Sequence, residues 1–118
     1  MAKEYNNGVV TYDDIGRVAF AYYKADIERF NAQSQRRIAR ASHPCDGEKT
    51  VFHYGSPEPE IVKSLCWQDN PDFNEWCDNC KYVQPFYESY MEAANKCRVA
   101  KARLTRFCKV RLWNEAND

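Results

Sequence analysis

The sequence lacks the features of a membrane protein and of a phosphate-binding enzyme. Its first eight residues, Met-Ala-Lys-Glu-Tyr-Asn-Asn-Gly, contain no apolar signal core, and no hydrophobic run approaches the length that crosses a bilayer. Only four glycines are present and none are clustered, which excludes a glycine-rich phosphate loop. We therefore expect a soluble, cytoplasmic protein with no membrane partner.

Histidine, the most frequent general acid or base in enzymes, is also scarce. The chain has two histidines, His43 and His53, and neither belongs to a recognisable nucleophile and base pattern. A zinc deaminase needs His-x-Glu followed by Pro-Cys-x-x-Cys, but neither histidine has that glutamate, and Trp76 stands where the proline should be. We expect a protein without enzymatic activity. Thiol oxidoreduction at the Cys-x-x-Cys pair is the first activity to test against that expectation.

What is present suffices for one modest folded domain spanning residues 1–118. The chain has 118 residues, of which 44% are hydrophobic and 14% aromatic, and this composition excludes wholesale disorder. Net charge is zero, but residues 43–80 carry eight acids against two bases and residues 81–112 carry eight bases against two acids. This uneven distribution of charge predicts that the two regions attract partners of opposite charge.

Residues 1–10 are expected to be loose, and residues 11–42 are predicted to form one long helix. Thr11 and Asp14 fit a capping box, while Val10 and Ile15 occupy the two positions of a hydrophobic staple. The helix should end near Ser42, because the proline at position 44 disfavours helical geometry in the residue before it. Apolar positions recur at three- and four-residue steps and predict one broad stripe: Ile15, Val18, Ala19, Tyr22, Tyr23, Ile27, Phe30, Ser34, Ile38 and Ala41.

The connector, residues 43–80, is broken by prolines and glycines into short pieces. We expect a short strand at residues 50–54 and a short helix at residues 58–67. Asn70-Pro71-Asp72 is typical of the cap and first turn of another helix. This segment is too broken to form much core of its own, so its cysteines are the available means of holding it together.

The last element, residues 81–113, is predicted to be a second long helix with one breaker, Pro85, in its first turns. Cys97 and Cys108 lie on its apolar stripe, where we expect small buried side chains without chemistry. Two helices of matched length predict a mainly α fold. We expect a long antiparallel helical hairpin joined by a compact, zinc-stapled irregular segment.

The motif that organises the chain is Trp76-Cys77-Asp78-Asn79-Cys80-Lys81. Two thiolates at this spacing turn toward one point, as a tetrahedral zinc site requires. We predict a structural Zn²⁺ site whose ligands are Cys45, Cys66, Cys77 and Cys80, with His43 and His53 as substitutes. Reduced thiols without metal, redox chemistry and an extracellular disulfide framework remain as alternatives.

Seven bases follow one another along the second helix with no acid between Glu92 and Glu115. They are Lys96, Arg98, Lys101, Arg103, Arg106, Lys109 and Arg111. Positive charge at this density can neutralise several phosphates, so nucleic acid is the first partner to expect. The alternative is an ordinary solvated helix face whose bases meet acids of this chain or of a protein partner.

The aromatic content exceeds what the seam between two helices needs. A protein-binding adaptor or inhibitor is therefore the rival hypothesis, acting through exposed helix faces on a host protein or on a second copy of the chain. Residues 76–112, with Trp-Cys-x-x-Cys before an aromatic and then basic helix, resemble small accessory proteins of phages and other mobile elements. The resemblance implies a binding role and assigns no site residue.

Overall fold

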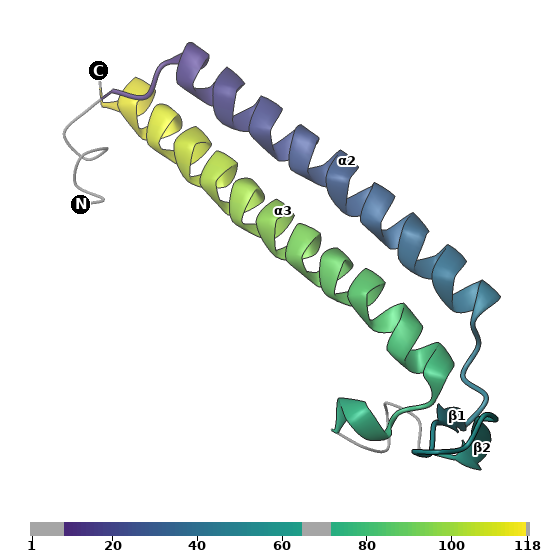
Figure 1. Ribbon diagram of the computed structural model, residues 1–118. Helices are drawn as coiled ribbons and strands as arrows, with labels where there is room; N and C mark the ends of the chain where they lie inside the picture. Colours follow the sequence, from purple (N-terminus) through teal and green to yellow (C-terminus); the bar gives the residue numbers. More distant parts are fainter. Residues whose placement is uncertain (1–8, 65–71, 118) are drawn as a thin grey trace. The chain divides into compact units, whose positions relative to one another are not determined.

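The computed structural model describes residues 9–64 and 72–117, which form two long helices that pack against each other and a small antiparallel sheet (Figure 1). The elements in order are α2 (Tyr12–Ser42), β1 (Glu48–Val51), β2 (Glu60–Lys63), the 3₁₀ turn η1 (Phe73–Glu75) and α3 (Asp78–Ala116). The prediction of a mainly helical protein is confirmed. No helix in these described ranges is long and apolar enough to span a bilayer.

The chain divides into two compact units, and each contains part of both helices. One unit is Met1–Asn31 with Met91–Asp118, and the other is Ala32–Tyr90. In the first unit, the Val10 amide donates to Asn114 Oδ1 at 3.0 Å, and the Cys97 thiol lies 3.6 Å from Asp26 Oδ1. Position along α2 thus rises as position along α3 falls, so the helices run antiparallel in this unit.

The start of α2 is set by the capping box that the sequence predicts. The Thr11 amide donates to Asp14 Oδ2 at 2.9 Å, and the Asp14 amide donates back to Thr11 Oγ1 at 3.1 Å. These two bonds satisfy amides that have no partner inside the helix. The preceding residue, Val10, is buried, and the helix ends at Ser42 as expected.

The single apolar stripe predicted for α2 is wrong, because its residues belong to two different faces. Val18 is buried and Tyr22 half-buried, whereas Tyr23, Ile27 and Phe30 are more than 60% exposed. On an ideal helix the centres of these two sets are about 125° apart. Three- and four-residue spacing is satisfied by both faces, so spacing alone could not separate them.

The side chains buried between the helices are small. In the first unit they include Val18 and Cys97, and in the second Ala39 and Val83. The expectation that Cys97 is a buried thiol is confirmed, while Cys108 is only partly buried. Small residues at a helix seam let the backbones approach closely, and the larger aromatic side chains are left to the outer faces.

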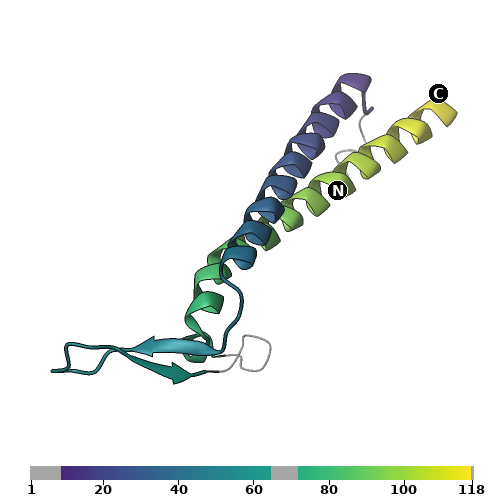
Figure 2. The same cartoon turned by 90° about the vertical axis from the view of Figure 1, so that its right-hand side faces the viewer.

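The connector contains a β-hairpin, which corrects part of the prediction (Figure 2). β1 and β2 pair antiparallel with Thr50 opposite Ile61, so the strand expected at residues 50–54 starts two residues earlier and ends at Val51. The helix expected at residues 58–67 is wrong over Glu60–Lys63, which is strand; residues 65–67 lie outside the described part. Adjacent Ile61 and Val62 are β-branched and favour an extended chain once a pairing partner is present.

Two local features complete the connector. Gly47 has a φ of +69°, a conformation that favours glycine, and its carbonyl accepts from the Ser64 amide at 2.8 Å. Of the predicted cap and first turn, Asn70 and Pro71 lie outside the described residues. Asp72, which was expected in the first turn, is instead the cap of the 3₁₀ turn η1 and accepts from the Asn74 amide.

The second long helix is three residues longer at each end than predicted, because it begins at Asp78 and ends at Ala116. The Lys81 amide donates to the Cys77 carbonyl at 3.0 Å, which is the first bond of the helix. The Cys-x-x-Cys turn and the first helical turn are therefore the same piece of backbone. Pro85 accordingly lies inside the helix rather than at its entry.

Candidate functional site

Three of the predicted ligands, Cys45, Cys77 and Cys80, lie close enough together to hold a metal ion. Cys45 follows the end of α2, Cys77 precedes α3, and Cys80 lies in the first turn of α3. Their sulfur atoms are all within 4.8 Å of one another, and the Sγ atoms of Cys45 and Cys77 are 3.8 Å apart. Tetrahedral zinc with Zn–S bonds of 2.3 Å places two sulfurs about 3.8 Å apart.

Burial distinguishes these thiols from ordinary surface cysteines. Cys77 is 0% exposed and Cys80 is 2% exposed, and both form one cluster with the buried Trp76 side chain, while Cys45 is exposed. The Cys80 amide donates to Cys77 Sγ at 3.4 Å, and such a bond stabilises negative charge on the sulfur. Burial of two of the three sulfur-bearing residues limits the access of other molecules to those thiols.

Polar side chains hold the segments that carry the cysteines. Asn79 Nδ2 donates to the Pro44 carbonyl at 2.8 Å, which fixes the chain immediately before Cys45. Asp78 Oδ2 accepts from the Thr50 amide at 2.8 Å and ties β1 to the start of α3. These bonds position the two cysteine-bearing segments without occupying their sulfur atoms.

Arg40 is a residue that sequence reasoning missed. Its Nη1 donates to the His43 carbonyl at 3.1 Å, and its Nη2 lies 3.4 Å from Cys80 Sγ. A zinc ion with four thiolates carries a net charge of −2, so a guanidinium at this place would offset part of it. The predicted antiparallel pairing of the two helices could have indicated Arg40, because it places the end of the first helix opposite the start of the second, where Cys80 lies.

Of the other predicted ligands, His43 and His53 are not part of this group. Cys66 lies outside the described residues, as does Trp67. The His43 ring stacks on Tyr82 with centroids 3.9 Å apart, and its Nδ1 is 3.3 Å from the Ala39 carbonyl. His53 Nε2 is 2.7 Å from Glu60 Oε1 in the β-hairpin. The identity of a fourth ligand therefore stays a prediction.

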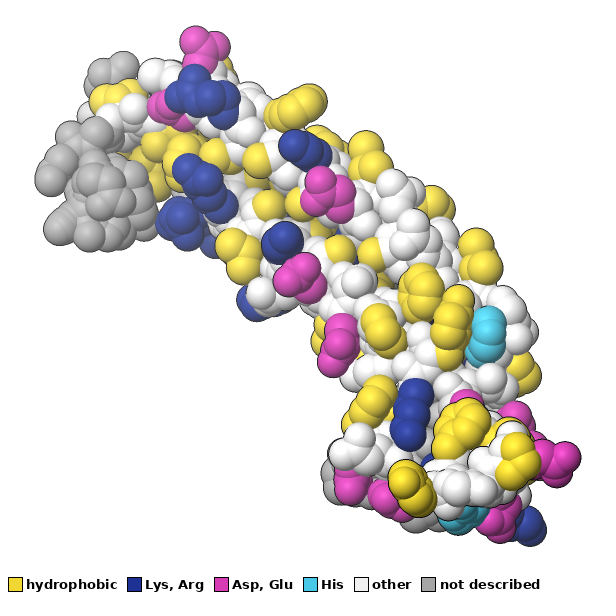
Figure 3. All heavy atoms as spheres, viewed as in Figure 1, with side chains coloured by type: hydrophobic (Ala, Val, Ile, Leu, Met, Phe, Trp, Pro, Cys, Tyr) yellow, Lys and Arg dark blue, Asp and Glu magenta, His cyan; other side chains and the backbone are white. Residues whose placement is uncertain are grey.

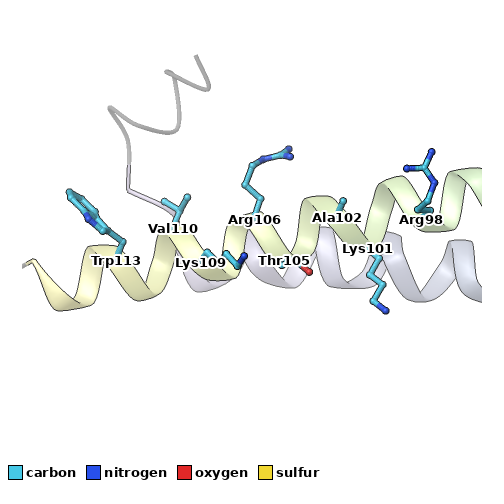
Figure 4. A pocket seen from close by; sticks show the side chains of 8 residues that line it. All are labelled: Arg98, Lys101, Ala102, Thr105, Arg106, Lys109, Val110 and Trp113. Carbon is cyan, nitrogen blue, oxygen red and sulfur yellow. The ribbon is translucent and has the colours of Figure 1, made fainter.

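The seven predicted nucleic-acid-binding bases do not share one surface. Four of them, Arg98, Lys101, Arg106 and Lys109, line an open hollow on α3 together with Ala102, Thr105, Val110 and Trp113, with a volume of about 710 Å³. Arg98, Arg106, Val110 and Trp113 project to the same side of the helix, whereas Lys101 projects to the opposite side (Figure 4). Basic side chains gather over the same half of α3 in Figure 3.

The remaining three bases lie elsewhere on α3. Lys96 and Arg103 line a separate hollow with Val18 and Ala21 of α2, with a volume of about 290 Å³. Arg111 is committed to contacts within its own unit. It donates to Glu115 at 3.0 Å and to the Val10 carbonyl at 3.2 Å, and its guanidinium lies 4.5 Å from the Tyr12 ring centre.

These contacts shift the pKa values of ionisable groups at this end of the helices. Hydrogen bonds from the Tyr12 hydroxyl and from Arg111 hold the pKa of Glu115 below its usual value of 4.5. The Glu115 carboxylate in turn raises the pKa of Arg111. Farther along α2, the Arg29 guanidinium lowers the pKa of Asp26, and the Cys97 thiol contributes in the same direction. All these contacts lie within the first unit.

No protein-family model, curated protein or solved structure matches the chain. The geometry of the described residues is therefore the basis for inferring function. The resemblance of residues 76–112 to accessory proteins of mobile elements stays a prediction.

Proposed function

We propose that this chain is a non-enzymatic, zinc-stabilised helical module that binds nucleic acid through α3. Cys45, Cys77 and Cys80 supply three thiolates, and Cys66 is the expected fourth ligand. Thiolate sets of this kind select zinc over the harder divalent ions that prefer oxygen ligands. The burial of Cys77 and Cys80 supports a structural site over thiol–disulfide exchange, and a reducing compartment such as the cytoplasm would keep the thiols available.

The observation that supports nucleic-acid binding is the surface of Arg98, Arg106, Lys109 and Trp113. These residues line one hollow, and the Trp113 side chain is 62% exposed beside the three cations. Cations on one surface can neutralise phosphates of the same strand, while an exposed indole provides a face on which an unpaired base stacks. The surface therefore suits single-stranded DNA or RNA better than a duplex.

The experiment is a titration of labelled single-stranded DNA, single-stranded RNA and duplex DNA over a range of salt concentrations. We expect single strands to bind more tightly, with an affinity that falls as salt rises, by a slope of about −0.7 per phosphate contact. Replacing Arg98 and Arg106 with glutamine should reduce the magnitude of that slope by about 1.4, because two contacts are lost. Trp113→Ala should weaken single-strand binding by about 1–3 kcal/mol.

The matched control replaces Lys96 and Arg103 with glutamine. It removes the same charge from the same helix but leaves the hollow with Trp113 intact. Absence of binding at low salt would contradict the proposal, and so would an equal loss in the two double variants.

A second candidate function is self-association through the outer face of α2. Phe20, Tyr23, Ile27 and Phe30 are 61–73% exposed and follow a three, four, three spacing, which places them on one side of the helix. Hydrophobic side chains recur along α2 on the surface in Figure 3. With full side-chain areas of about 150–250 Å² for the aromatics, two such faces would bury roughly 800–1,200 Å² in total. This reaches the lower end of specific interfaces, so a second copy of the chain is the expected occupant.

Native mass and light scattering test this candidate. We expect a dimer that Ile27→Lys converts to a monomer, because the change places an unpaired charge at the centre of the apolar face. Val99→Lys, at an exposed apolar position of α3, is the control and should leave the dimer intact. A wild-type protein with the mass of a monomer at high concentration would contradict it.

A further inference from the structure

A smaller hollow lies against Cys80 in the unit Ala32–Tyr90 and is lined by two arginines. It has a volume of about 140 Å³ and is enclosed by Arg36 and Arg40 of α2 and by Cys80, Val83, Gln84 and Tyr87 of α3. Arg36 and Arg40 are four residues apart, so they occupy the same side of α2 on consecutive turns. The candidate metal site accounts for Arg40 and Cys80 but not for Arg36, and the basic hollow on α3 includes none of these residues.

Both guanidinium groups are held in place by other parts of the unit. Arg40 is fixed by its bonds to the His43 carbonyl and to Cys80 Sγ. The Arg36 guanidinium lies 4.9 Å from the Tyr90 ring centre and 6.0 Å from the Tyr87 ring centre, within cation–π range. The hollow therefore presents fixed positive groups rather than flexible surface side chains.

One polar atom of Arg36 has no partner among the described residues. Its Nε is buried and makes no hydrogen bond there. A buried donor left without an acceptor is costly, and native proteins rarely keep one. On the α3 side, Gln84 Nε2 donates to Glu88 Oε2 at 3.1 Å. The lining therefore carries two guanidinium groups, and one of them, Arg40, also lies 3.4 Å from the Cys80 sulfur.

We infer that this hollow binds a small oxyanion, a phosphate or a carboxylate group. A guanidinium recognises both with the paired N–H donors of its planar fork, and Arg36 and Arg40 each bring one such group to the lining. The volume corresponds to four or five waters at about 30 Å³ each, which accommodates a phosphate ion and is too small for a nucleotide. The inference is independent of nucleic-acid binding, because the basic hollow on α3 belongs to the other unit.

The test is a calorimetric titration of the full chain as purified with inorganic phosphate, and in a second arm with acetate, at constant ionic strength. We expect one saturable site, with phosphate or acetate preferred according to the shape of the natural group. Arg36→Met should weaken binding at least about tenfold, because charge-assisted hydrogen bonds are lost. Arg37→Met is the matched control, since it removes the same charge from the neighbouring exposed position of α2 and should bind as wild type.

Circular dichroism checks that each variant is folded. If Arg36→Met does not fold, Arg36→Lys decides the question, because lysine keeps the charge but lacks Nε and the planar fork. A weaker affinity in Arg36→Lys supports the site. Wild-type affinity in Arg36→Lys, an equal loss in Arg37→Met, or no saturable binding of either anion to the wild type would overturn the inference.

Discussion

Replacing Cys77 with serine should remove both the metal and the zinc-dependent part of the stability of the unit Ala32–Tyr90. Cys77 is fully buried, it contacts Cys45 and Cys80, and its carbonyl accepts the first hydrogen bond of α3. Serine is a poor zinc ligand, so a hydroxyl would be left in a site that was formed by thiolates. We expect one zinc ion per wild-type chain and none in the variant.

The magnitude follows from mass action. An ion that binds only the folded state, at 100 to 1,000 times its dissociation constant, stabilises that state by about 2.7–4.1 kcal/mol. Urea unfolding of the wild type should lose this amount when a chelator is added, whereas the Cys77→Ser protein should be insensitive to the chelator. Trp76 lies in the same buried cluster, so its fluorescence reports the transition once Trp67 and Trp113 are replaced by phenylalanine.

Cys97→Ser provides the control because Cys97 is also buried but lies in the other unit, beside Asp26. It should lower stability by about 1 kcal/mol or less, and the zinc-dependent difference should remain. The metal-dependent stability of this unit would be refuted if the wild type were purified without metal and fully ordered. It would also be refuted if Cys77→Ser and Cys97→Ser responded identically to the chelator.

Two further predictions concern the unit of Met1–Asn31 and Met91–Asp118. Thr11→Ala removes the hydroxyl that accepts from the Asp14 amide and should lower the free energy of unfolding in urea by about 1 kcal/mol. The control is Thr105→Ala, at an exposed position inside α3, which should lower it by less. Equal losses in the two variants would argue against the capping box. The pKa values of Asp14 and Glu115 are lowered by hydrogen bonds, so their contribution is present above their usual values of 3.8 and 4.5 and is lost as pH falls through the lower folded values. Stability should therefore decrease from about pH 5 to pH 3, and Glu115→Gln should flatten that profile while Glu92→Gln should not.

The helices could be predicted from the sequence because their signals are local. Capping residues, helical periodicity and Pro44 lie within a few positions of the boundaries they set, and both ends of α2 agree with them. β2 was missed because its conformation depends on pairing with β1, which lies about a dozen residues earlier. The local sequence around Pro57 and Pro59 fitted a helix entry equally well.

The three clustered cysteines could be predicted from the sequence, but the surface on which each base lies could not. The Cys77 and Cys80 pair is a local motif, and Cys45 is predictable because the connector contains few other thiols. The seven bases form a set because no acid lies between them in the sequence. That property does not indicate toward which side of the helix each base points. At 100° per residue, Arg98, Arg103 and Arg111 point to different sides of α3, and only the structure separates them.

The small size of the seam residues explains why each unit needs contacts other than apolar packing. Val18 and Cys97 in one unit, and Ala39 and Val83 in the other, bury little area compared with the aromatic side chains that lie outside. The first unit compensates through the hydrogen bonds that join Val10 and Tyr12 to Arg111, Asn114 and Glu115. The second unit has the cysteine cluster in the corresponding role. Removal of a bound metal should therefore loosen the second unit and leave the first unit ordered, because the hydrogen bonds of the first unit include no metal ligand.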